Sequence, residues 1–174
     1  MPALRRARGS LVLLAATVSL VPSLAAADGI VRRQVGNFPI AASVTVPQGA
    51  ELVYVSGMLP DPVEPAVAGP EGRPARFGDT EAQAESVFRK LAAALEAAGY
   101  APRDVVKMNV YLVGDPAAGG RMDFAGFMRA YGRHYGHAGQ PNVPARTTVQ
   151  VVALPIPGAW VEIEVIAARA APRP

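Results

Sequence analysis

Apolar and polar residues alternate along several short segments of the chain, as expected for strands with one buried face. The alternation is clearest at 106–112, where the apolar side chains face one way and the polar ones the other; the apolar set is Val106, Met108, Val110 and Leu112. β-Branched runs bounded by glycine or proline predict further strands at 30–35, 42–46, 52–56, 146–152 and 160–168.

A spacing of three to four residues marks two helices. Val87, Leu91 and Leu95 form an apolar stripe within 80–98, and Gly99 is a typical residue to end that helix. Thr80 and Gln83 have the spacing of a capping box at its start. The second helix is predicted from 122 to about 135, where it presents aromatic and methionine side chains. Both patterns indicate helices that lie on a sheet.

The predicted order of elements is β-β-β-α-β-α-β-β, with a long proline- and glycine-rich loop at 61–78. Strands and helices are mixed, but only two helices are available. This favours an α+β fold over a doubly wound sheet. A chain of 174 residues that is 51% hydrophobic is large enough for a single domain with its own core.

The first residues have the three-part pattern of a secretory signal peptide. Arg5, Arg6 and Arg8 precede a short apolar run at 11–21, and Ala25 and Ala27 provide a cleavage site. The apolar run is too short to cross a bilayer. We therefore expect residues 1–27 to be a signal peptide and 28–174 to be the mature domain, exported to the periplasm or secreted, with no membrane association after cleavage.

Charge and composition exclude several kinds of partner. The net charge of +3 comes from the three arginines of the predicted signal, so residues 28–174 are formally neutral, unlike a surface that binds nucleic acid. There is no cysteine, and the two histidines, His134 and His137, are too few for a zinc site. We expect no metal and no nucleic-acid partner.

Polar residues gather on the last two predicted strands. Arg146 and Thr148 share one face of the first, and Glu162 and Glu164 share one face of the second. If the two strands are neighbours, the cation and the carboxylates lie on one sheet face. That face is either a solvated surface with weak ion pairs or a site where Arg146 grips a carboxylate ligand in two places.

The stretches NVPARTTVQVVALP and WVEIEVIAARA resemble the C-terminal signature of the RidA family, the reactive enamine/imine deaminases, also called L-PSP endoribonucleases. The similarity runs from about Phe38 to Ala168. The resemblance implies a chorismate-mutase-like α+β fold, a homotrimer, and a ligand cleft at each subunit interface.

The resemblance also implies roles for individual residues. Arg146 matches the arginine that grips the substrate carboxylate, and Glu162 matches the glutamate that positions the attacking water. Ser56 and Gly57 match the serine–glycine turn that lines the cleft, and Thr148 matches a position that lines it through its backbone. The implied activity is hydrolysis of 2-imino or enamine acids to 2-keto acids and ammonia, without a cofactor.

The chain departs from the family pattern at positions that line this cleft. Ile40 replaces a common tyrosine, and Met128 replaces a common asparagine. The pocket is therefore expected to be unusually apolar and to favour bulky, apolar imino acids. The alternative expectation is a non-catalytic binder of small carboxylates that keeps the arginine and has lost the chemistry.

Overall fold

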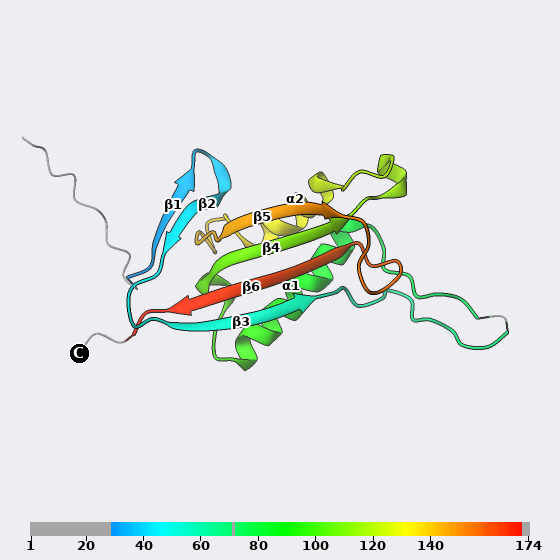
Figure 1. The fold of residues 1–174 in the computed structure, drawn as a ribbon, viewed down its shortest axis with the longest axis horizontal. Helices are drawn as coiled ribbons and strands as arrows, with labels where there is room; N and C mark the ends of the chain where they lie inside the picture. Colours follow the sequence, from blue (N-terminus) through cyan, green and yellow to red (C-terminus); the bar gives the residue numbers. More distant parts are fainter. Residues whose placement is uncertain (1–28, 71, 172–174) are drawn as a thin grey trace, which may run out of the picture.

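The predicted strands assemble into one sheet, and both helices pack against the same face of it (Figure 1). These features are seen in a computed structural model that describes residues 29–70 and 72–171. The predicted signal peptide lies outside the described residues. Among the described residues, no helix is both long and apolar enough to span a membrane.

The order of elements agrees with the prediction, and the α+β class is confirmed. The strands are β1 (Val31–Val35), β2 (Phe38–Thr45), β3 (Glu51–Met58), β4 (Val105–Val113), β5 (Ala145–Val151) and β6 (Val161–Arg169). The helices are α1 (Thr80–Ala97) and α2 (Phe124–His134), and short 3-10 turns occupy Pro102–Asp104 and Pro116–Ala118.

The strand order in the sheet is β1-β2-β5-β4-β6-β3. β5 pairs with β4 in parallel over seven residue pairs, and β6 pairs with the other side of β4 in antiparallel orientation. The strands that carry Arg146 and Glu162, β5 and β6, are therefore not neighbours, because β4 lies between them. A parallel neighbour needs a crossover through a helix, and α2 places β5 on one side of β4. The following connection then returns β6 to the other side.

β2 joins the rest of the sheet through one residue pair, Ala41 with Ala145. Its partner β1 pairs only with β2, so the two strands form a hairpin at one end of the sheet (Figure 1). At the opposite end β3 is the outer strand and pairs with β6.

The main core lies between the helices and the sheet. On α1 the predicted stripe of Val87, Leu91 and Leu95 is buried, and on α2 Phe127 and Tyr131 are fully buried. They face buried side chains of the central strands: Met108, Val110, Leu112, Val161, Ile163 and Val165. The helices therefore cover one sheet face, here called the covered face, and leave the opposite face, the open face, without a layer of helix.

A bulge in β4 moves Val106 from its predicted position. The register between β4 and β6 shifts between Val105 and Lys107, and Val106 packs with Ile30 and Ala168 in a second small apolar cluster. Val106 was predicted to share a face with Met108, which instead belongs to the main core. An extra residue in one strand breaks the two-residue period, because two consecutive side chains then point the same way.

The start of α1 also differs from the prediction. Asp79, not Thr80, caps the helix, and its carboxylate accepts a hydrogen bond from the backbone N–H of Ala82 at 2.8 Å. Gln83 is buried and serves another purpose. Its side-chain oxygen accepts from the N–H of Trp160 at 2.6 Å, and its nitrogen donates to the carbonyl of Gly158 at 3.2 Å. Gln83 thus ties the helix to the loop before β6.

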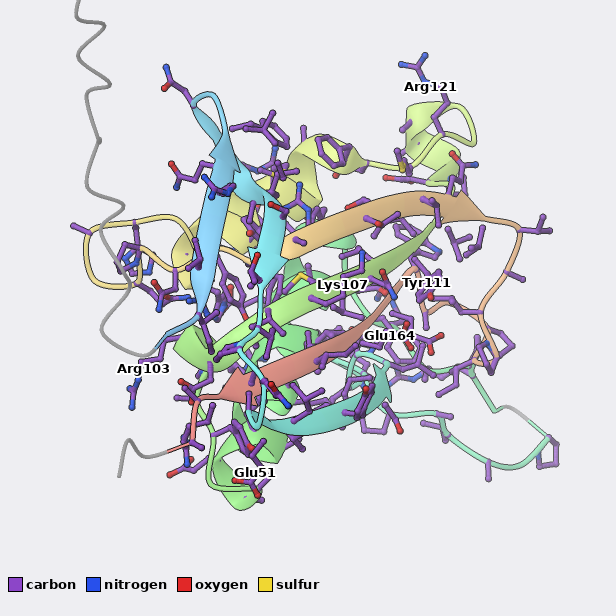
Figure 2. The ribbon with its side chains drawn as sticks, turned by 60° about the vertical axis from the view of Figure 1, so that its left-hand side comes forward. Glu51, Arg103, Lys107, Tyr111, Arg121 and Glu164 are labelled. Atoms are coloured by element: carbon purple, nitrogen blue, oxygen red, sulfur yellow. The ribbon has the colours of Figure 1, made fainter. Side chains whose placement is uncertain are left out.

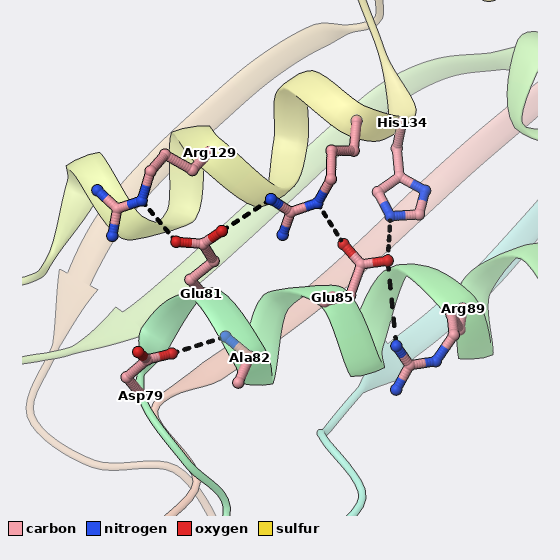
Figure 3. Close-up of polar contacts among 8 residues, drawn as sticks. Asp79, Glu81, Ala82, Glu85, Arg89, Arg129 and His134 are labelled. Carbon is pink, nitrogen blue, oxygen red and sulfur yellow. Dashed lines mark hydrogen bonds and ion pairs between the residues drawn. The ribbon is translucent and has the colours of Figure 1, made fainter.

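Ion pairs join the outer surfaces of the two helices (Figure 3). Glu81 accepts hydrogen bonds from Arg129 at 2.5 Å and Arg133 at 2.7 Å, and together they lower the pKa of its carboxyl. Burial raises the pKa of Glu85, but its contacts with Arg133 and His134 outweigh burial and leave that pKa lowered. The pairs hold the helices together at the surface, above the aromatic core.

The predicted long loop extends away from the sheet between β3 and α1 (Figure 1). Two isolated bridges, Glu64 with Arg76 and Val67 with Arg73, give it the form of a narrow arm. Glu64 also forms ion pairs with both arginines. The arm is therefore held by local backbone and charge contacts, although its sequence has no strand-like period.

Candidate functional site

Arg146 lies on the covered face, on the side of the sheet where α2 packs. Its partner on β4 is Met108, which is fully buried beneath the helices. The side chain ends among four aromatic rings. Its guanidinium carbon is 4.3 Å from the ring centre of Tyr131, 5.1 Å from that of Phe127, and 5.8 Å from those of Phe38 and Phe124. We call this arrangement the aromatic cage.

The cation in the aromatic cage lacks a carboxylate partner among the described residues. One terminal nitrogen, Nη2, contacts the sulfur of Met128 at 3.2 Å, and the other, Nη1, is buried without a hydrogen-bond partner. Burial lowers the pKa of Arg146, and its contact with Tyr131 opposes that only in part. A buried guanidinium with an unused donor is costly unless an acceptor satisfies it. The geometry thus favours binding of an anion.

Thr148 and Tyr131 complete the polar groups near the cation. Thr148 follows Arg146 on the same face of β5, and its hydroxyl oxygen is buried without a partner. The phenol of Tyr131 donates to the carbonyl oxygen of Pro39 at 2.8 Å. Burial raises the pKa of Tyr131 to about 12, so the phenol is neutral at physiological pH and holds β2 against α2.

Ile40 and Met128 lie on the same side of the molecule as Arg146. Both are partly buried and pack against the main core, Ile40 from β2 and Met128 from α2. Four of the predicted site residues, Arg146, Thr148, Ile40 and Met128, therefore belong to the covered face. Except for the Arg146 guanidinium and the Thr148 hydroxyl, these four side chains are apolar.

The remaining predicted residues lie on the open face. Glu162 is paired with Tyr111 of β4, opposite the buried neighbours Val161 and Ile163. Gly57 lies directly against it, because a Cβ built at Gly57 would overlap the Glu162 carboxylate. Ser56 precedes this glycine in the irregular stretch of β3 between Val55 and Met58. Ser56, Gly57 and Glu162 thus form one group, separated by the sheet from Arg146.

Glu164 lies next to this group on the open face and accepts hydrogen bonds from two side chains. Asn109 donates to it at 2.7 Å, and the Tyr111 hydroxyl donates at 3.2 Å. Partial burial and the charges of Glu164 and Glu162 raise the pKa of Tyr111. Figure 2 shows Lys107, Tyr111 and Glu164 together over this face. Glu164 is satisfied within the chain, whereas Glu162 has no partner of this kind among the described side chains.

A hollow of about 400 Å³ lies on the open face next to these groups. It is lined by Tyr54, Ser56, Lys107, Asn109, Glu164 and Ile166, among others. Tyr54 is 71% exposed, so a large aromatic surface faces outward beside polar groups. This face therefore combines exposed aromatic surface with polar groups.

The histidines take structural positions. His134 contacts the Glu85 carboxylate at 3.0 Å and lies over the ring of Phe88 at 4.8 Å between ring centres. His137 accepts from the backbone N–H of Gly139 at 3.2 Å. Within the described part of the chain, no three histidine, aspartate or glutamate side chains are grouped so as to hold a metal ion.

The aromatic cage was not anticipated as part of the site. Phe124, Phe127 and Tyr131 have helical spacing, which predicts a core stripe, and nothing in their spacing relates them to a strand residue. The signal that could have identified them is Arg146 itself, a cation on a strand that contains no acidic residue. Such a charge requires a compensating environment, and aromatic rings provide one.

Comparisons with known proteins identify the family of this chain. Residues 39–169 match the family model described as Endoribonuclease L-PSP. Protein DfrA of Myxococcus xanthus is 37% identical over 130 residues, which cover 74% of this chain and 84% of that protein. A RutC family protein of Pyrococcus horikoshii is 31% identical over 130 residues, covering 74% and 88%.

Solved structures show the same fold. A Rid family protein from Yersinia pestis superposes with a TM-score of 0.56 at 26% identity, covering 75% of this chain and 87% of that one. TdcF of E. coli, solved with bound serine, has a TM-score of 0.50 at 30% identity, covering 72% and 85%. The chain therefore belongs to the endoribonuclease L-PSP family, also known as the RidA/YjgF family.

Proposed function

We propose that this protein hydrolyses 2-imino acids to 2-keto acids and ammonia in a cleft shared by two subunits of a homotrimer. One subunit contributes Arg146 and its aromatic cage, and the neighbour contributes Ser56, Gly57 and Glu162. The observation that carries the proposal is the buried Arg146 guanidinium with an unused N–H and no carboxylate partner in the described chain.

A carboxylate ligand supplies what Arg146 lacks. Two carboxylate oxygens can accept from Nη1 and Nη2 together, replacing only the weak contact with the Met128 sulfur. The neighbouring Thr148 hydroxyl is a further unused polar group on that side. Serine, the molecule bound in E. coli TdcF, carries the same α-carboxylate, which supports a ligand of amino-acid size.

The shared cleft follows from the two sheet faces. Arg146 points to the covered face and Glu162 to the open face, with the backbone of the sheet between them. A ligand of amino-acid size cannot contact both within one subunit. A closed ring of three copies can place the Arg146 side of one subunit against the open face of the next. Tyr54 and the other exposed apolar groups of that face would then be covered.

The chemistry needs a positioned water and a base. The imine carbon is electrophilic because its C=N bond is polarised and, when protonated, carries positive charge. Glu162 accepts a proton as the water oxygen bonds to that carbon and then returns it to the nitrogen of the resulting carbinolamine. The C–N bond breaks, ammonia leaves, and the hydroxyl loses its proton to form the keto group. One imine and one water give one keto acid and one ammonia, so the reaction consumes no oxidant or reductant.

Complementation between variants tests the shared cleft. We expect trimers of Arg146→Ala and trimers of Glu162→Gln each to be inactive when freshly generated 2-imino acids are supplied. When the two variants are unfolded and refolded together in equal amounts, about one quarter of the clefts combine an intact arginine with an intact glutamate, so about one quarter of wild-type activity should return. Light scattering on each sample should give a trimer mass.

No recovery after mixing, with trimers present, would exclude a cleft built from these two residues across an interface. A stable monomer with full activity would exclude the assembly itself.

A non-catalytic binder of small carboxylates is the second candidate. The observation that favours it is that two positions beside Arg146 are apolar: Ile40 stands where the family commonly has a tyrosine, and Met128, which contacts the guanidinium, where it commonly has an asparagine. A binder would show Arg146-dependent affinity for a 2-keto acid, yet would hydrolyse imines no faster than the spontaneous rate.

A further inference from the structure

The aromatic cage has a buried floor and a more exposed mouth. Phe127 and Tyr131 are fully buried beneath the Arg146 guanidinium. Phe38 and Phe124 both lie 5.8 Å from the same carbon, but Phe38 is 43% exposed and Phe124 is only partly buried. A ligand that reaches the guanidinium from solvent therefore meets Phe38 and Phe124.

These two rings come from different elements. Phe38 begins β2, in the hairpin at one end of the sheet, and Phe124 begins α2. Phe124 is fixed by contact with Phe127, at 6.2 Å between ring centres. The helix therefore supplies a fixed wall of the mouth, and the hairpin supplies the opposite wall.

The walls between mouth and floor are also apolar. Ile40 and Met128 pack beside the cage, and the only hydroxyl of its rings, that of Tyr131, is already bonded to the carbonyl of Pro39. Apart from the Thr148 hydroxyl beside the cation, a polar ligand side chain would lose water there without gaining a partner. An apolar side chain would cover the rings and release the water around them.

We propose that Phe38 and Phe124 are specificity-determining residues that select imino and keto acids with large apolar side chains, aromatic ones most strongly. The inference rests on the proposed function, because it takes the carboxylate of the ligand to be held by Arg146. A planar side chain gains most, because it can contact both flat rings while its carboxylate stays on the cation. A methyl side chain leaves both rings in water.

The test is a series of 2-oxo acids that differ only in the side chain. Calorimetry on the assembled wild-type protein would compare 2-oxopropanoate, 4-methyl-2-oxopentanoate and 3-phenyl-2-oxopropanoate. We expect affinity to rise in that order, with the phenyl compound at least about tenfold tighter than the methyl compound. 1-Phenylpropan-2-one, which has the ring and the carbonyl without the carboxylate, should not bind detectably.

Phe38→Ala and Phe124→Leu probe the two walls. Each change should reduce the ratio of the affinities for the phenyl and methyl compounds about threefold to tenfold. Val152→Ala is the matched control, because Val152 is 99% exposed and has no contact with the cage. Melting temperatures and light scattering on each variant separate a loss of selectivity from a loss of structure. The same ranking is expected in the hydrolysis rates of the matching imines.

The outcomes separate this inference from the proposed function. Equal affinity for all three acids, together with dependence on Arg146, overturns the selectivity and leaves the carboxylate site standing. No binding of any acid overturns the proposed function as well. If Phe38→Ala dissociates the trimer, Phe38 is an interface residue, and its role at the mouth is refuted. Unchanged selectivity in both variants refutes the inference directly.

Discussion

Replacing Arg146 with lysine changes the shape of the cation while keeping its formal charge. In the aromatic cage the guanidinium lies 4.3 Å from the ring centre of Tyr131 and has one unused buried donor. A lysine amine cannot present two parallel N–H groups, and it cannot stack flat on an aromatic ring. Arg146→Lys therefore tests whether the fork or only the charge binds the ligand.

The expected loss of affinity has two parts. Losing one charge-assisted hydrogen bond costs ~1.5–3 kcal/mol, which corresponds to about one to two decades in Kd. The second part depends on pH. Burial already lowers the pKa of Arg146, whose guanidinium nonetheless stays protonated. The same burial lowers the pKa of a lysine amine, which starts much lower, so the variant loses its proton at a lower pH than an exposed lysine.

The sign of the pH dependence follows directly. Only the protonated amine attracts a carboxylate, and raising the pH removes its proton. The affinity of Arg146→Lys for 4-methyl-2-oxopentanoate should therefore fall as pH rises from about 6 to about 9, while that of the wild type stays flat. Calorimetry at each pH measures both, and Arg89→Lys, at an exposed arginine of α1, is the matched control.

Equal affinities for variant and wild type would refute the assignment of Arg146 as the carboxylate anchor. A loss of affinity that does not change with pH would support the need for two parallel N–H groups. It would refute the claim that the aromatic cage shields the bound cation from water.

Four further results are expected. Gly57→Ala should displace the Glu162 carboxylate and lower turnover about a hundredfold without changing oxo-acid affinity; equal turnover would contradict the contact between them. Gly132→Ala, at an exposed helical site with open space around it, should raise the unfolding free energy by ~0.5–1 kcal/mol in denaturant titrations; destabilisation would contradict that environment. The pKa of Glu85 is lowered in the folded state, so its stabilisation is present above its usual pKa and is lost as pH falls through the folded pKa. Glu85→Gln should therefore lower Tm at about pH 7, and the difference should shrink as pH falls below about 4. The mature protein should begin at or near Asp28 by N-terminal sequencing from the native host, and an intact N-terminus in a cytosolic fraction would contradict export.

The sequence predicts the elements of this fold because apolar spacing reports directly on burial. The stripe of Val87, Leu91 and Leu95 is buried as expected, and the order of strands and helices is correct. The errors are local. Asp79 and Thr80 are both good capping residues, and spacing alone does not decide which of them caps the helix. A bulge at Val106 breaks a two-residue period that the sequence shows as unbroken.

The site was harder to predict because it depends on relations between strands. Alternation fixes which residues of one strand share a face, but it does not relate the faces of two strands. Arg146 and Glu162 could therefore each be assigned to a strand. That they lie on opposite faces of the sheet follows only from the way β4 pairs with β5 and with β6. Phe38 and Phe124 reach Arg146 through tertiary packing, for which no local signal exists.

Because β2 and β5 share a single residue pair, the two sides of the aromatic cage differ in local stability. Arg146 and Thr148 lie on a strand that is paired with β4 over seven residues. Phe38 lies on a strand that pairs with β5 only at Ala41 and is otherwise held by side-chain contacts such as the hydrogen bond from Tyr131 to Pro39. A segment with so few backbone bonds to the sheet can open without global unfolding, and it belongs to the fast-exchanging part of a protein. Part of the free energy of ligand binding is then spent on ordering the hairpin. We therefore expect the anchor to be ordered before the ligand binds, and amide hydrogen exchange in the hairpin to slow when the site is filled.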